Sequence, residues 1–110
     1  MECWRLLHPK GSVVALPPRN HRITAKDAAE YIKRHRDHDP QGVRSHAFHK
    51  DQVLELLGHP GCVGLRIHHA RSKDGAPTLV LTAMDAADND LPAASPLQNP
   101  FPCPPFCGGG

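Results

Sequence analysis

The segment CVGLRIHHARSKDGAPTLVLTAMD, residues 62–85, decides the fold. Apolar and polar residues alternate in both of its arms, with the period of a half-buried β-strand. Leu65 and Ile67 fall on one face of the first arm, and Leu79 and Leu81 fall on one face of the second. The alternation therefore predicts a β-hairpin over this segment.

The register of the hairpin depends on the length of its loop. A two-residue loop would place Ile67 opposite Thr82 and mix the two faces of the hairpin. A three-residue loop over residues 73–75 places Ile67 opposite Leu81. That loop needs a type I turn followed by a residue at positive φ, and Gly75 stands at that place. We therefore predict the three-residue loop.

Two helices and one more strand are predicted before the hairpin. Thr24 resembles an N-cap, with Asp27 three residues later as in a capping box, so a helix is expected over about residues 25–37. Residues 43–49 alternate as a short strand. A second helix follows over residues 51–57 and is expected to end at the glycine after it.

The order helix, strand, helix, strand, strand predicts an α+β fold with a small, mostly antiparallel sheet and helices on one face. We expect an irregular N-terminal arm over residues 1–22, in which residues 13–16 can add an edge strand. The α+β domain is expected over residues 23–91. An extended tail rich in Pro, Cys and Gly, residues 92–110, is expected to add little to stability. The expected core consists of Ile32, Val53, Leu57, Val63, Leu65, Ile67, Leu79 and Leu81.

The charges are distributed unevenly along the 110 residues. All 13 Lys and Arg lie in residues 1–73 with seven of the 11 acids, for a net +6, and residues 74–110 carry the other four acids, for a net −4. All nine His also lie in the basic part, which therefore gains charge as the pH falls through about 6.5. The basic part lacks an aromatic-basic motif, which disfavours nucleic acid as a partner.

Length and cysteine content constrain the compartment. There is no run of 18 apolar residues, so no membrane span is expected. The N-terminal apolar patch is too short for the core of a signal peptide, so we expect a cytoplasmic protein with reduced thiols. Cys103 and Cys107 are the exception, because a local disulfide between them is geometrically possible.

Four stretches of the chain resemble a group of small uncharacterised bacterial proteins. They are ITA at residues 23–25 continuing to Tyr31-Ile32, GCVGLR at residues 61–66, DGAPTLVL at residues 74–81 and CPPFC at residues 103–107. The resemblance covers roughly residues 23–107. It implies a small bacterial soluble domain, and it brings no activity with it.

Cys62, His59 and His69 are candidates for thiol chemistry. A catalytic cysteine needs a base within hydrogen-bond reach and often a helix N-terminus that lowers its pKa. His59 lies three residues before Cys62 and His69 lies on the same hairpin, but no helix begins after Cys62. Since Cys is among the most buried residue types, a structural role for Cys62 is favoured.

Metal ligation is the second kind of chemistry considered. His35 and His38 fall on one face of the first predicted helix, and Asp39 follows them. Cys103 and Cys107 would supply half of a zinc site, without a second cysteine pair to complete it. These side chains are more typical of a polar surface and a tail, so we predict neither a metal nor a cofactor.

Two surfaces are candidates for binding a protein partner. On the face of the hairpin opposite the predicted core lie Arg66, His68 and Thr82, and this face can meet a partner, a second copy or solvent. In the tail, Phe101 and Phe106 can act as anchors on a backbone stiffened by proline.

These observations favour a small soluble protein-interaction module without enzymatic activity. One alternative is a thiol- or metal-dependent enzyme that uses Cys62 with His59 or His69. Another is a phosphate or nucleic-acid binder that uses basic residues in and after the first helix. Those residues are Lys33, Arg34, Arg36 and Arg44.

Overall fold

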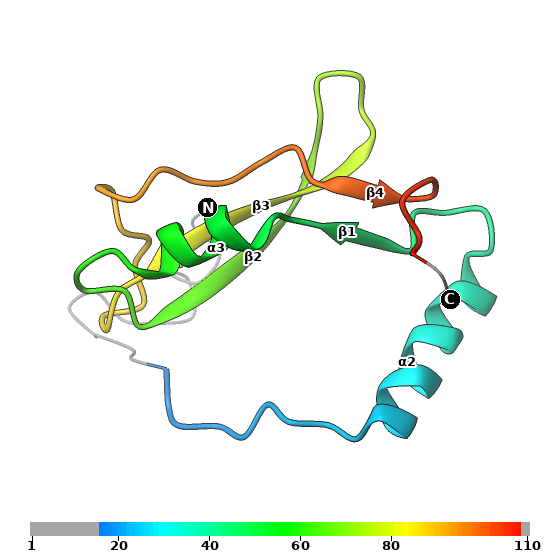
Figure 1. The fold of residues 1–110 in the computed structure, drawn as a ribbon, viewed down its shortest axis with the longest axis horizontal. Coiled ribbons are helices and arrows are strands. Elements are labelled where there is room, and N and C mark those ends of the chain that lie inside the picture. Colours follow the sequence, from blue (N-terminus) through cyan, green and yellow to red (C-terminus); the bar gives the residue numbers. More distant parts are fainter. Residues whose placement is uncertain (1–15, 109–110) are drawn as a thin grey trace, which may run out of the picture.

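A computed structural model describes residues 16–108 of the chain (Figure 1). It confirms the α+β class. The elements follow in the order α2 (Ala25–His38), β1 (Ser45–Ala47), α3 (Lys50–Leu57), β2 (Gly64–Arg71), β3 (Pro77–Met84) and β4 (Phe101–Cys103). Most of the expected N-terminal arm and most of its expected edge strand lie outside the described residues. Within the described part, residues 16–24 form neither helix nor strand.

The hairpin β2–β3 has the predicted register. Ile67 lies opposite Leu81 in an antiparallel pair. The backbone N–H of Gly75 donates to the carbonyl of Ser72 at 2.9 Å, and the N–H of Ser72 donates to the carbonyl of Ala76 at 2.9 Å. Gly75 has φ +85°, a left-handed conformation that suits glycine because it has no Cβ. The three-residue loop is therefore confirmed.

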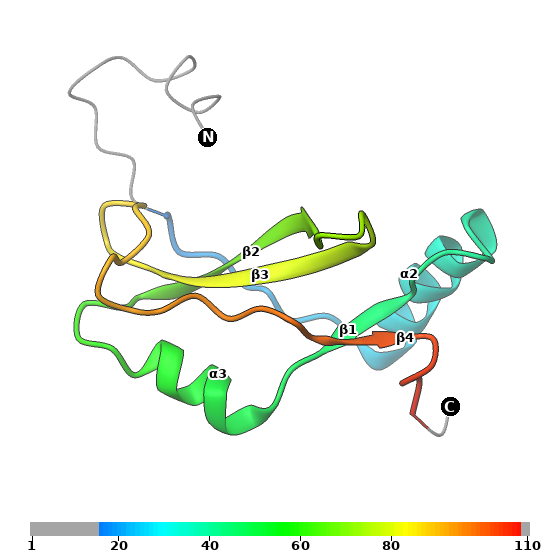
Figure 2. The same ribbon diagram turned by 90° about the horizontal axis from the view of Figure 1, so that it is seen from above.

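The expected single sheet is wrong, because the upstream strand pairs with the tail. β1 covers only residues 45–47, is antiparallel to β4 and places Ser45 opposite Cys103. The structure therefore has two separate two-stranded sheets, β1–β4 and β2–β3 (Figure 2). Residues 48 and 49 leave the strand and lead directly into α3.

The tail packs along β3, in contrast to the expectation that it adds little to the domain. Leu97 and Leu81 exchange backbone N–H···O bonds, both at 2.9 Å. Ala94 is buried in the same cluster as Leu81, Ala83 and Leu56 of α3. Figure 2 shows the tail running beside β3 on its way to β4. The stabilising contacts of β3 thus come from both α3 and the tail.

The predicted core is only partly correct. Leu81 is buried, and Val53 and Leu79 are half-buried. The other five predicted core residues are exposed: Ile32, Leu57, Val63, Leu65 and Ile67. Residues opposite each other in an antiparallel pair share a face, so Leu65 and Ile67 do lie on the side of Leu81. They are exposed because α3 and the tail cover β3 and not β2.

Helix α2 has the predicted cap but packs weakly. The Thr24 hydroxyl accepts a hydrogen bond from the backbone N–H of Asp27 at 3.1 Å. Lys33 and Asp37 form an ion pair at 2.6 Å. The hydrogen bond that Lys33 donates lowers the pKa of the Asp37 carboxyl. No residue of α2 is buried, and Ile32 is 63% exposed because no described layer lies against it.

Cys103 and Cys107 form a disulfide, with their Cα atoms 4.7 Å apart. The sequence left two roles open for this pair, a local disulfide and half of a zinc site. The structure shows the disulfide, so neither sulfur is a free thiolate that could bind zinc. Cys62 is the free cysteine among residues 16–108, and Cys3 lies outside them. Within the same range, every helix is too short or too polar to cross a membrane.

Candidate functional site

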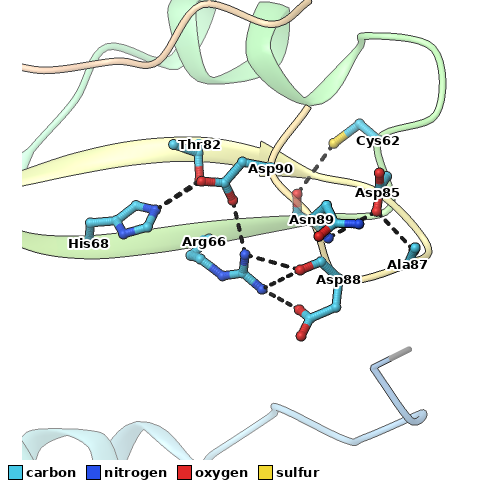
Figure 3. Close-up of polar contacts among 10 residues, drawn as sticks. Cys62, Arg66, His68, Thr82, Asp85, Ala87, Asp88, Asn89 and Asp90 are labelled. Carbon is cyan, nitrogen blue, oxygen red and sulfur yellow. Dashed lines mark hydrogen bonds and ion pairs between the residues drawn. The ribbon is translucent and has the colours of Figure 1, made fainter. Parts of the chain in front are cut away.

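A turn of acidic residues folds back onto the basic strand β2 (Figure 3). We call residues 85–90 the acidic turn. The guanidinium of Arg66 forms an ion pair with the carboxylate of Asp88, and its Nη1 lies 3.0 Å from Oδ1 of Asp90. The two terminal guanidinium nitrogens, Nη1 and Nη2, also donate to the Asp88 carbonyl at 3.4 Å. Arg66 thereby makes four polar contacts within the chain, and its side chain is 31% exposed.

The acidic turn owes its shape to its first residue. The Asp85 carboxylate accepts hydrogen bonds from the backbone N–H groups of Ala87 at 2.9 Å and Asn89 at 3.0 Å. Such side-chain acceptance is typical of aspartate at the start of a turn. Asp88 has φ +67°, which aspartate tolerates better than most residues. The turn therefore presents Asp88 and Asp90 to β2.

His68, Thr82 and Asp90 meet beside Arg66, but not as a proton relay. Nε2 of His68 lies 3.2 Å from the Thr82 hydroxyl and 3.4 Å from Oδ2 of Asp90. A hydroxyl–imidazole–carboxylate triad uses the two ring nitrogens for different partners. Here both partners meet the same nitrogen, and Thr82 is buried. The arrangement serves to hold the turn on the sheet.

The structure thus brings Arg66, His68 and Thr82 together, as the sequence indicated, but satisfies them internally. Asp88 and Asp90 were not recognised as their partners. The signal that could have found them is the charge distribution, because the acidic segment after β3 is complementary to the basic β2. Side chains expected to meet another molecule instead bind the same chain.

In the described part of the chain no strand pairs with the outer edge of β2, and the odd-numbered residues of β2 point their backbone groups toward that edge. Hydrogen-bonded and non-hydrogen-bonded pairs alternate along an antiparallel ladder. In β3, the N–H and carbonyl of Leu81 bond Leu97, and the carbonyl of Ala83 accepts from Leu91, so these residues face away from β2. Their partners Ile67 and Leu65 accordingly face away from β3. Among residues 16–108, β2 pairs with β3 alone.

Beside this edge lies an apolar shelf, which we define as Leu65 and Ile67. Their side chains are 37% and 53% exposed. The shelf continues the face on which Leu81 and Ala83 are buried. An exposed edge strand beside apolar side chains is a template for pairing with another chain. The outer edge of β2 therefore has the backbone groups needed to pair with one more strand.

Cys62 shows no catalytic arrangement. Its Sγ donates to the carbonyl of Gly64 at 3.3 Å, the residue is half-buried, and it packs against the core. His59 contacts it through the backbone, where the N–H of Cys62 donates to the His59 carbonyl at 3.1 Å. His69 lies seven residues further along an extended chain, roughly 20 Å away. The structure does not assemble the three candidates.

The candidate metal ligands are also dispersed. His35 and Asp39 line the same hollow, whereas His38 is not among the residues that line it. Cys103 and Cys107 are joined to each other. In the described part of the chain, no group of three or more His, Cys, Asp or Glu side chains is placed to hold a metal ion.

The tail phenylalanines gather into an exposed aromatic corner. The rings of Phe101 and Phe106 pack edge to face with centroids 5.0 Å apart, and Phe101 packs on His49 at 5.5 Å. Phe101 is 41% exposed and Phe106 is 56% exposed. They remain candidates for contact with a partner. Their mutual packing, which the sequence did not predict, fixes their positions before any partner binds.

The basic residues of α2 do not form one surface. Lys33 pairs with Asp37, and the Arg34 guanidinium lies 5.4 Å from the centre of the Tyr31 ring. Arg36 and Arg44 line a second hollow beside the disulfide, of about 490 Å³. Arg44 also lines a larger hollow.

Comparison of the chain with protein-family models, with curated proteins and with solved structures finds no match.

Proposed function

We propose that this chain is a protein-binding module that accepts an extended peptide segment along the open edge of β2. The observation that carries the proposal is the coincidence of unpaired backbone groups with the apolar shelf on a single strand. An added strand would gain main-chain hydrogen bonds from the edge and side-chain burial from the shelf. Arg66 and His68, which the acidic turn occupies, are not needed for this binding.

The charge of β2 selects the partner. Its eight residues, GLRIHHAR, contain two Arg and two His and no acid. Because Arg66 and His68 face the acidic turn, His69 and Arg71 are the basic residues left to face a partner. A second copy paired through the same edge would set basic residues only against basic or apolar ones, and like charges directly opposite each other destabilise a sheet. A foreign strand that carries acidic side chains is complementary. The occupant is therefore an acidic partner segment rather than a second copy.

The order of residues along β2 predicts which residue types the partner segment carries at each position. The odd-numbered face of β2 runs from Leu65 and Ile67 to His69 and Arg71. An antiparallel segment would thus begin with acidic residues opposite Arg71 and His69 and continue with β-branched apolar residues opposite the shelf. The even positions of the segment face the other side and are free to be polar.

The test is a titration of the full chain with the peptide Glu-Thr-Glu-Thr-Val-Thr-Val-Thr-Val, followed by backbone NMR. We expect the amides of Leu65, Ile67 and His69 to exchange rapidly in the free protein and to become protected when the peptide is added. The amides of Arg66 and His68 already bond β3 and should be protected in both states. Protection confined to the odd-numbered residues is the signature of an added strand.

Two matched controls make the experiment decisive. Ile67→Lys should weaken binding by roughly tenfold, whereas Ile32→Lys, the same change at an exposed site on α2, should leave it unaltered. The peptide with Lys in place of Glu should bind more weakly than the acidic one. Equal effects of the two substitutions would contradict the proposal. Concentration-dependent dimerisation of the free chain that Ile67→Lys abolishes would replace the acidic partner with a second copy.

A further inference from the structure

A hollow of about 630 Å³ lies where the end of α2, the start of β1 and the tip of the hairpin meet. It is separate from the apolar shelf, because its lining comes from the loop end of the hairpin and includes His69, Ala70 and Arg71 but neither Leu65 nor Ile67. The volume falls within the range of small-molecule sites and is far larger than a single phosphate requires. We refer to it as the basic hollow.

The ionisable groups around the basic hollow are mostly cationic or neutral. Arg44 of the segment before β1 and Arg71 of β2 carry permanent charge. Asp39, the residue that caps α2, is the one carboxylate among the lining residues. Three histidines from three different elements complete the ionisable lining: His35, His46 and His69. Polar side chains that converge from separate elements distinguish a site from a scattered surface charge.

The two arginines have donors to spare. Among residues 16–108, no hydrogen bond or ion pair engages the Arg44 side chain. Arg71 donates from Nη1 to the Gly75 carbonyl at 3.0 Å, which leaves most of its guanidinium donors free. A guanidinium binds phosphate through paired N–H groups, with planar geometry that lysine cannot reproduce. The hollow thus offers two guanidinium groups that can bind an oxyanion.

The remaining wall is apolar and is formed by Val43, Ala70, Pro77 and Leu79. An oxyanion alone would leave this wall unused. From the two arginines, the volume and the apolar wall, we propose that the basic hollow binds a small organic phosphate, whose phosphoryl group lies between Arg44 and Arg71 and whose planar or apolar part packs on Val43, Pro77 and Leu79. This inference does not rest on peptide binding at the β2 edge, but the two proposed sites share His69 and Arg71.

The test compares three probes with the full chain by calorimetry and by NMR shifts of Ala70 and Val43. Adenosine monophosphate should bind, and inorganic phosphate and adenosine should each bind at least about tenfold more weakly, because each lacks one half of the recognition. Equal binding of inorganic phosphate would show an adventitious anion only. Tighter binding of a single-stranded RNA, with shifts that extend over α2, would replace the proposal with a nucleic-acid surface.

Substitutions inside and outside the basic hollow test whether the nucleotide binds there. Arg44→Gln and Arg71→Gln should each weaken nucleotide binding by roughly tenfold. Arg34→Gln removes the same charge from α2 outside the hollow and should change the affinity by less than about twofold. Asp39→Asn should strengthen binding by about threefold, since it removes the opposing carboxylate. If Arg34→Gln and Arg44→Gln act equally, the binding is nonspecific and the proposal fails. Ile67→Lys should leave nucleotide binding unchanged, which separates this test from the peptide test.

Discussion

Arg66 illustrates how one side chain decides which face of a small sheet is free. On β2 it alternates with apolar neighbours and would be solvent-exposed in an isolated hairpin. Its ion pairs with Asp88 and Asp90 instead bring the acidic turn onto that face, and His68 follows with Thr82 and Asp90. The polar face of the hairpin is thereby covered, and the apolar shelf on the other face is left open.

At the same scale, Leu81 and Leu65 differ in burial although the sequence pattern places both on the same face of the hairpin. Leu81 is 4% exposed and packs with Leu56, whereas Leu65 is 37% exposed on the same face. We expect Leu81→Ala to lower the free energy of unfolding by about 2–5 kcal/mol and Leu65→Ala to lower it by less than about 1 kcal/mol. Urea unfolding of both variants measures the difference. Equal losses would show that the shelf is covered in solution.

At the scale of the element, the hairpin loop makes a pH prediction. The Ser72 hydroxyl, and then the backbone N–H of Ala76, donate to the Asp74 carboxylate and lower its pKa below the ordinary aspartate value. Because the pKa is lower in the folded state, the stabilisation is present above about pH 4 and is lost as the pH falls through the folded pKa.

Carboxyl NMR titration should therefore find the Asp74 pKa below that of an exposed aspartate, and Ser72→Ala should raise it. Asp37 of α2, whose pKa is lowered by its hydrogen bond with Lys33, serves as the internal reference, because Ser72→Ala should not change it. A Ser72→Ala chain with an unaltered Asp74 titration would show that the hydroxyl does not bond the carboxylate in solution.

The elements differ in how far the sequence predicts them. The hairpin register follows from residues close together in the chain, since Gly75 permits one loop and Ile67 then meets Leu81. The cap of α2 is equally local. The pairing of Ser45 with Cys103 is not, because it joins distant segments and one of them is rich in proline. Pairings of this kind leave no periodic signal within a single strand.

In the candidate sites too, features that depend on neighbouring residues follow from the sequence, and features that join distant segments do not. The apolar shelf consists of residues that the sequence correctly assigned to the core-side face, but periodicity does not say how far α3 and the tail extend over that face. The basic hollow joins His35, Arg44 and Arg71 from separate elements, and their convergence depends on where α2 ends relative to the hairpin tip. Only Arg44 of these was a sequence candidate for phosphate.

At the scale of the whole molecule, the tail should determine stability. A chain that ends at Leu91 loses Ala94, the two bonds between Leu97 and Leu81, and all of β4. We expect its thermal midpoint to fall by roughly 10 °C or more below that of the full chain, because each lost kcal/mol lowers the midpoint of a domain this size by about 4–8 °C. Calorimetry of both proteins measures this.

A matched control isolates the disulfide from the packing of the tail. Cys107→Ser opens the Cys103–Cys107 link and keeps every other tail residue, and the closed loop is so short that its removal should cost far less than the truncation. If the shortened chain melted together with the full chain, the contacts of Ala94 and Leu97 with β3 would not stabilise the fold in solution.

The position of the tail on β3 also sets an order of events during synthesis. The chain leaves the ribosome from its N-terminus, so β2 and β3 emerge before residues 91–103 do. During that interval β3, like β2, lacks a neighbour on its outer side, and Leu81 and Ala83 lack the cover of Ala94. The nascent hairpin is then an apolar ribbon open along both sides. Emergence of the tail closes the side along β3, whereas no strand among residues 16–108 pairs with the outer side of β2.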